Sequence, residues 1–138
     1  MPEVEVNGTK LYYQLEGSGP VLVLANGIFQ RIEAWEPLMP HLEGYRVLRY
    51  DMRGQGRSAV PEGAYTPELH AQDLEALLAA LGLERYHLLG LSNGGVVAQV
   101  FAARRPAGLQ SLTLLCTTPR LDPLIRAKVE SWRLALER

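Results

Sequence analysis

The residues most suited to chemistry form a single pentapeptide, Gly-Leu-Ser-Asn-Gly at 90–94, with Ser92 at its centre. It directly follows an apolar run at 86–89 and precedes a stretch of small, apolar residues. This order predicts a strand that turns sharply into a helix with the Ser92 hydroxyl at the apex, the geometry of a nucleophile elbow. Gly90 and Gly94 suit such a turn, because a Cβ atom at either position would collide with the other arm. The alternative is a strand-to-helix turn that performs no chemistry.

Length and composition narrow the class of protein. A chain of 138 residues, 47% of them hydrophobic, is long enough for one domain with a buried core. A net charge of −1, with both signs mixed along the chain, gives no electrostatic reason to expect nucleic acid or an anionic membrane as a partner. No apolar run approaches the roughly 18 residues that span a bilayer, and the first residues do not form a signal peptide. We therefore expect a soluble, cytoplasmic protein.

Strands are predicted on both sides of the pentapeptide. An Asn-Gly pair at 7–8, between two strand-like runs, predicts an antiparallel hairpin at the N-terminus. A continuous apolar run of the kind found in covered strands lies at 21–25, and further strand-like runs are predicted at 45–50, 86–89 and 109–116. The last run contains Cys116, the only cysteine, so no intrachain disulfide is possible. We expect Cys116 to be a buried strand residue.

Helices are predicted between these strands. Helical spacing of apolar residues first occurs at Trp35, Leu38, Met39 and Leu42. Thr66 and Gly82 mark the start and the end of a second helix, and the elbow helix is the third. Asp122 opens a final helix whose apolar stripe is Ile125, Val129, Trp132 and Leu136. Alternating strands and helices after a hairpin predict an α/β fold, with a mostly parallel six-stranded sheet and helices on both faces.

Motifs along essentially the whole chain make it resemble the α/β-hydrolase family. Residues 26–29 read Asn-Gly-Ile-Phe, after the third strand, where many members carry His-Gly. Residues 51–58 match the Asp-x-Arg-Gly-x-Gly-x-Ser loop of the esterase, lactonase and haloperoxidase-like branch. The stretch at 66–85 and the elbow at 90–94 complete the series. Among members of this branch, 3-oxoadipate enol-lactonase-like proteins look most similar, and the likeness is to their N-terminal half.

The resemblance implies roles for particular residues. Ser92 would attack the acyl carbon of a small ester, lactone or related substrate. The backbone N–H groups of Ile28 and Asn93 would form the oxyanion hole. Asp51 and Arg53 are expected to be structural, as a charge-assisted pair that braces neighbouring loops. Neither a metal nor another cofactor is implied.

The acid and the histidine of the family's catalytic triad have no match in this sequence. The family places both after the nucleophile, and the only later aspartate, Asp122, suits a helix N-cap. The three histidines are expected to be surface or core residues: His41, His70 and His87. Without a general base a serine hydroxyl is a poor nucleophile, so we expect the 138-residue chain alone to be nearly inactive. Residues 1–118 would belong to the hydrolase core, and residues 119–138 would begin its cap or lid.

Two other classes of function stay open. A C–C bond hydrolase or a cofactor-free haloperoxidase would use the same scaffold, and a truncated hydrolase fold would serve as a binding or assembly module without catalysis. Haloalkane dehalogenases and epoxide hydrolases are disfavoured, because they carry aspartate where Ser92 stands. The strand at Leu109–Cys116 is internal in the family fold, so we expect its open edge, the terminal helix, or both to form a homo-oligomer here.

Overall fold

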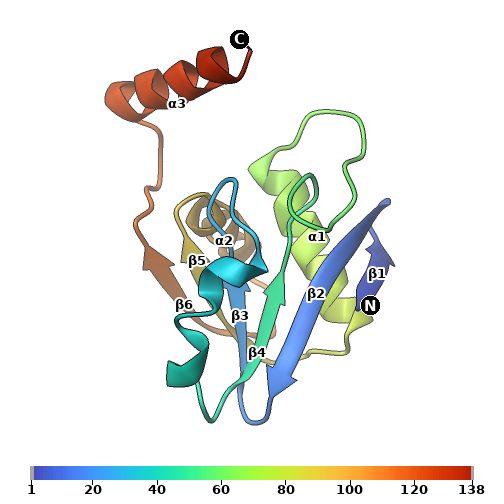
Figure 1. The fold of residues 1–138 in the computed structure, drawn as a ribbon. Coiled ribbons are helices and arrows are strands. Elements are labelled where there is room, and N and C mark those ends of the chain that lie inside the picture. The colour runs from blue at the N-terminus through green and yellow to red at the C-terminus, as the bar shows by residue number, and fades with distance from the viewer. Residues whose placement is uncertain (1, 138) are drawn as a thin grey trace.

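The computed structural model describes residues 2–137, which form one α/β unit (Figure 1). Its strands are β1 (Glu3–Val6), β2 (Thr9–Gly17), β3 (Val21–Ala25), β4 (Arg46–Tyr50), β5 (Tyr86–Leu91) and β6 (Leu109–Leu115). Its α-helices are α1 (Pro67–Ala80), α2 (Asn93–Ala103) and α3 (Pro123–Leu136). Two short 3-10 helices, η1 (Ile32–Trp35) and η2 (Met39–His41), lie between β3 and β4.

The strands form one six-stranded sheet in the order β1-β2-β4-β3-β5-β6. The hairpin β1–β2 is antiparallel and pairs with β4, whereas β4, β3, β5 and β6 run parallel to one another. Val23 of β3 pairs with Leu48 on one side and with Leu88 on the other. The predicted position of β3 between β4 and β5 is therefore confirmed, and with it the predicted class of fold.

Alternate residues of the strands point to two different layers. Helices α1 and α2 pack on one face, and the core between them and the sheet includes Val23, Leu48, Leu74, Leu88 and Phe101. On the other face, Trp35 from η1 packs on Leu24 and Val47. Burial on both faces explains why the central strand β3 is a continuous apolar run.

The helix predicted around Trp35 is replaced by the turns η1 and η2. Their backbone hydrogen bonds join residues three apart, as from Leu38 N–H to the Trp35 carbonyl. Pro37 and Pro40 explain the difference, since neither has an N–H to donate and each ring would clash with the carbonyl four residues earlier. The apolar spacing nevertheless predicts which side of this segment is buried, because Trp35 packs against the sheet.

The other helix signals are confirmed. The Thr66 side chain accepts a hydrogen bond from the Leu69 N–H at 3.1 Å, and Pro67 is the first residue of α1. Gly82 follows the end of α1 with a φ of 66°. Asp122 caps α3 by accepting from the Ile125 N–H at 2.9 Å.

Strand β6 is the last strand of the sheet, and within residues 2–137 no strand pairs with its outer edge. Figure 1 shows α3 standing away from the sheet beyond this strand, and none of its described residues is buried. The prediction that Cys116 is buried is wrong: it follows the end of β6, has a φ of 50° and is exposed. Within residues 2–137, no further strand lies beside β6 to cover that side chain. Association through this edge or through α3 stays a prediction.

Among residues 2–137, no helix is both long enough and apolar enough to cross a bilayer.

Candidate active site

Ser92 joins β5 to α2 in a strained backbone conformation. Its φ is 53° and its ψ is −115°, in a region that residues with a side chain rarely adopt. The Ser92 N–H donates to the Leu115 carbonyl at 2.9 Å, and the Ser92 carbonyl accepts from the Thr117 hydroxyl at 2.8 Å. These bonds to β6 and the residues after it hold the strained turn. The sharp strand-to-helix turn that the sequence predicts at Ser92 is confirmed.

Gly90 and Gly94 allow the strand and the helix to approach each other. A Cβ atom on Gly90 would lie 2.5 Å from the Gly94 carbonyl oxygen. A Cβ atom on Gly94 would lie 2.5 Å from the carbonyl carbon of Ala25, in β3. Both glycines are therefore required by close backbone contacts. Gly90 meets the other arm of the turn as the sequence predicts, whereas Gly94 meets β3 instead.

The Ser92 side chain is free to react. Ser92 is exposed, and its hydroxyl does not cap α2 although it stands at the N-cap position. Within residues 2–137 the hydroxyl makes no hydrogen bond to another group. The hydroxyl of a serine at a helix N-cap usually accepts a hydrogen bond from the second or third backbone N–H of the helix. The strained turn leaves the Ser92 hydroxyl without this bond.

Ile28 and Asn93 line the same pocket, which has a volume of about 280 Å³. Asn93 is the first residue of α2, where the backbone N–H has no carbonyl partner within the helix and the helix dipole is positive. Ile28 lies in the loop after β3, where the Gly27 N–H donates to the Gln30 side chain at 2.8 Å. Segments that follow two different strands, β3 and β5, thus meet at one pocket.

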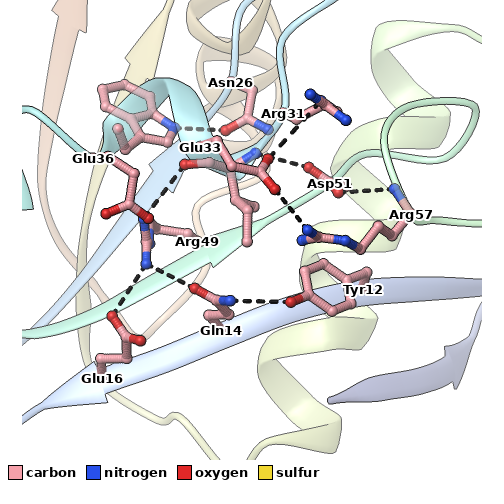
Figure 2. A network of polar contacts seen from close by, with 12 residues as sticks. Tyr12, Gln14, Glu16, Asn26, Arg31, Glu33, Glu36, Arg49, Asp51 and Arg57 are labelled. Carbon is pink, nitrogen blue, oxygen red and sulfur yellow. Dashed lines mark hydrogen bonds and ion pairs between the residues drawn. The ribbon is translucent and has the colours of Figure 1, made fainter. Parts of the chain in front are cut away.

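Asn26 anchors the loop that carries Ile28. Its side-chain amide donates to the Tyr50 carbonyl at 2.9 Å. Its side-chain oxygen accepts from the Trp35 indole at 2.6 Å (Figure 2). Asn26 is completely buried. An asparagine therefore orders this loop at the position where many family members carry histidine.

Asp51 braces the same loop, but not through Arg53. Its carboxylate accepts from the Ile32 N–H at 2.9 Å and from the Arg57 N–H at 3.0 Å (Figure 2). The carboxylate therefore joins the loop after β3 to the loop after β4. The expected Asp51–Arg53 pair does not form, because the Arg53 guanidinium donates to another carboxylate.

Arg53 pairs instead with Asp73 of α1. Two hydrogen bonds, of 2.6 and 2.7 Å, join the guanidinium to the carboxylate, and Asn7 donates to the same carboxylate at 2.8 Å. The pair raises the pKa of Arg53. Sequence reasoning missed Asp73, although an acidic residue on the same helix face as Leu74 and Leu77 signals a buried ion pair.

A buried arginine in β4 secures the turns on the opposite face of the sheet. Arg49 lies 2.7 Å from Glu36, after η1, and 3.1 Å from Glu16 of β2 (Figure 2). Its guanidinium also donates to Gln14 at 2.7 Å. The segment that follows Ile28 is thus tied to two strands.

The three histidines have different surroundings. His41 is exposed in η2, and His87 of β5 places its Nδ1 2.7 Å from the Ser111 hydroxyl. His70 of α1 is only 8% exposed and lines the pocket beside Ile28 and Asn93. The sequence predicts that His70 is a surface or core residue, and it does not predict the pocket. The apolar spacing of α1 identifies the buried face of the helix but not the other segments that this face contacts.

Burial lowers the pKa of His70, against a smaller opposing effect of Asp73, while Arg53 acts in the same direction as burial. Between this lowered pKa and the ordinary value of 6.5, the unfolded chain binds more protons than the folded one. We therefore expect the free energy of unfolding to rise with pH through that window. Urea unfolding across roughly pH 5 to 8 will measure it. His70→Leu should flatten the rise, whereas His41→Leu should not; an unchanged slope in His70→Leu would contradict the prediction.

No group of three or more metal-ligating side chains occurs within residues 2–137.

Known proteins share the sequence pattern and the fold of this chain. The model of the alpha/beta hydrolase fold family matches residues 20–136. The chain belongs to the α/β-hydrolase family. A fluoroacetate dehalogenase from Burkholderia is 34% identical over 122 residues, which are 84% of this chain and 40% of that protein. A putative carbamate hydrolase from Stutzerimonas stutzeri is 40% identical over 106 residues, 75% of this chain and 40% of that protein.

A solved structure extends the comparison. The enol-lactonase from Burkholderia xenovorans is 36% identical and superposes with a TM-score of 0.84, covering 88% of this chain and 48% of that one. This α/β-hydrolase chain thus spans less than half the length of these relatives.

Proposed function

We propose that Ser92 is the nucleophile of a hydrolase that acts on an ester, lactone or related acyl compound. The observation that carries the proposal is its strained, exposed position at the end of β5, with an uncommitted hydroxyl. Strain of this kind persists only where the surroundings fix it, and it concentrates at functional sites. The Ile28 and Asn93 amides at the neighbouring pocket support the same function.

The reaction follows from these groups. The Ser92 oxygen attacks the acyl carbon while its proton passes to a general base, and the carbonyl oxygen becomes an oxyanion. The Ile28 and Asn93 N–H groups stabilise that charge, and as backbone donors they are fixed before it develops. Collapse expels the alcohol, which takes up the proton, and leaves an acyl-serine ester. Water then attacks the ester, releases the acid and restores the serine.

The general base of this proposal is a histidine outside the 138 residues, oriented by a carboxylate. Within the described residues no histidine forms a hydrogen bond with Ser92. Relatives of which this chain covers only 40% support the assignment, because they have room for both residues beyond the matched part.

The elbow residue favours acyl substrates over halides. The carboxylate of an aspartate nucleophile is already charged, whereas the hydroxyl at Ser92 needs a base and forms a stable ester with an acyl group. Among the relatives, the enol-lactonase and the putative carbamate hydrolase are named for substrates that contain an acyl carbonyl. The proposed substrate class includes both types.

A fluorophosphonate probe with mass spectrometry tests the role of Ser92. We expect the 138-residue chain to be labelled at Ser92, far more slowly than a full-length esterase, and Ser92→Ala to abolish labelling. Ser111→Ala is the matched control, because Ser111 is exposed and lies 2.7 Å from His87 but is not at an elbow. Labelling that survives in Ser92→Ala would refute the proposal. Labelling as fast as in the full-length esterase would place the base within this chain, with His70 as the first residue to test.

A further inference from the structure

The pocket beside Ile28 and Asn93 is built from four segments of the chain. The loop after β3, the loop after β4, the start of α1 and the start of α2 all contribute to its wall. Its lining contains one arginine and no carboxylate: Ile28, Phe29, Arg53, Gly54, Gln55, Tyr65, Pro67, His70 and Asn93.

The arginine in this wall is already neutralised. Two nitrogens of Arg53 donate to the Asp73 carboxylate, and one of them also donates to the Asn7 carbonyl at 3.0 Å. The side chains of Arg53 and Asp73 are 7% and 2% exposed. The pocket therefore offers no uncompensated charge to a ligand.

His70 is held firmly in the wall. Its ring meets the Tyr65 ring edge to face, with centroids 6.0 Å apart and planes at 74°. The Tyr65 hydroxyl donates to the Pro61 carbonyl at 2.6 Å, and the Tyr65 ring covers Gly54, where a Cβ atom would collide with it. The imidazole is thus positioned before any ligand arrives.

The polar atoms of His70 have no partner. Neither ring nitrogen forms a hydrogen bond within residues 2–137, and Nδ1 is fully buried. The side-chain oxygen of Gln55, in the same wall, is also buried without a partner. Buried polar groups are nearly always hydrogen-bonded, so an imidazole without any partner in a pocket wall is unusual. Because Nδ1 is fully buried, Nε2 is the ring nitrogen that a ligand in the pocket can reach. Burial lowers the pKa of His70, so at pH 7 its ring is neutral and carries one donor and one acceptor nitrogen.

We propose that His70 determines specificity at this pocket, by hydrogen bonding to an uncharged hydroxyl on the acyl substrate of Ser92. The proposal rests on the proposed function. An alkyl group in the hydroxyl's place leaves the buried imidazole unsatisfied, which is how sites built around a hydrogen bond reject apolar analogues. A carboxylate finds no free cation to offset its desolvation.

Nuclear magnetic resonance of the 138-residue chain tests this with three esters as probes. They are methyl 3-hydroxybutanoate, methyl 3-methylbutanoate, in which a methyl replaces the hydroxyl, and monomethyl succinate, which carries a carboxylate. We expect the hydroxy ester to shift the His70 imidazole nitrogens and the Ile28 and Asn93 amides. Its dissociation constant should be about fivefold lower than that of the methyl analogue, the value of one net hydrogen bond.

Variants assign the preference to His70. His70→Leu should bind the hydroxy and methyl esters equally, His70→Gln should restore part of the preference, and His41→Leu should leave it intact. The preference should also persist in Ser92→Ala, so it stands or falls separately from the role of Ser92 as nucleophile. Equal or tighter binding of the methyl or carboxylate ester, an unchanged preference in His70→Leu, or no shift with any ester would overturn the proposal.

Discussion

Gly94→Ala is expected to destabilise the chain by at least about 3 kcal/mol, enough to prevent folding of a marginal domain. The new Cβ atom would lie 2.5 Å from both the Ala25 carbonyl carbon and the Asn26 carbonyl oxygen. Both neighbours are backbone atoms at the end of the central strand β3, so no side chain can rotate away to relieve the collision. Urea unfolding followed by circular dichroism measures the effect.

Gly82→Ala is the matched control for Gly94→Ala. Gly82 has a φ of 66°, and a Cβ atom there would meet nothing within 4 Å. The control carries only the backbone penalty of the left-handed region, about 1 kcal/mol. Similar losses of stability in the two variants would show that the elbow and β3 can move apart.

Asp73→Ala is expected to cost about 3 to 5 kcal/mol of unfolding free energy. It removes the carboxylate that accepts two hydrogen bonds from Arg53 and one from Asn7. The guanidinium stays nearly buried without a counter-ion, and removing one partner of a buried pair is far more costly than removing both. The double variant Arg53→Met with Asp73→Leu should therefore lose less unfolding free energy than Asp73→Ala alone.

Glu75→Ala provides the comparison with an exposed ion pair on the same helix. Glu75 lies 2.7 Å from Arg104, but the two side chains are 58% and 42% exposed. Such pairs contribute between about 0 and 1 kcal/mol. A loss in Asp73→Ala no larger than that in Glu75→Ala, measured by urea unfolding, would mean that water reaches Arg53 readily.

The sequence was sufficient for those parts of the fold that depend on local pattern. The hairpin at Asn7, the cap at Thr66 and the elbow at Ser92 each depend on neighbouring residues, and all three are as predicted. The helix expected around Trp35 failed because apolar spacing does not weigh the two prolines, whose missing donors decide the local structure.

Long-range pairing was harder to predict than local structure. Asp51 and Arg53 are two residues apart, yet each is satisfied by a different part of the chain, at Ile32 and at Asp73. The spacing of residues in the loop does not show which groups donate to the Asp51 carboxylate. His70 was missed as a pocket residue for the same reason, since a pocket belongs to several segments and appears only when they are brought together.

The hydrogen bonds that hold Ser92 make the elbow and the edge of the sheet one thermodynamic unit. Leu115 ends β6 and Thr117 follows it, and these residues hold the N–H and the carbonyl of Ser92. A strand that pairs with the outer edge of β6 would order both residues and, through them, the nucleophile. Coupling between two binding events is reciprocal, so a group attached to Ser92 would in turn strengthen that pairing by the same factor.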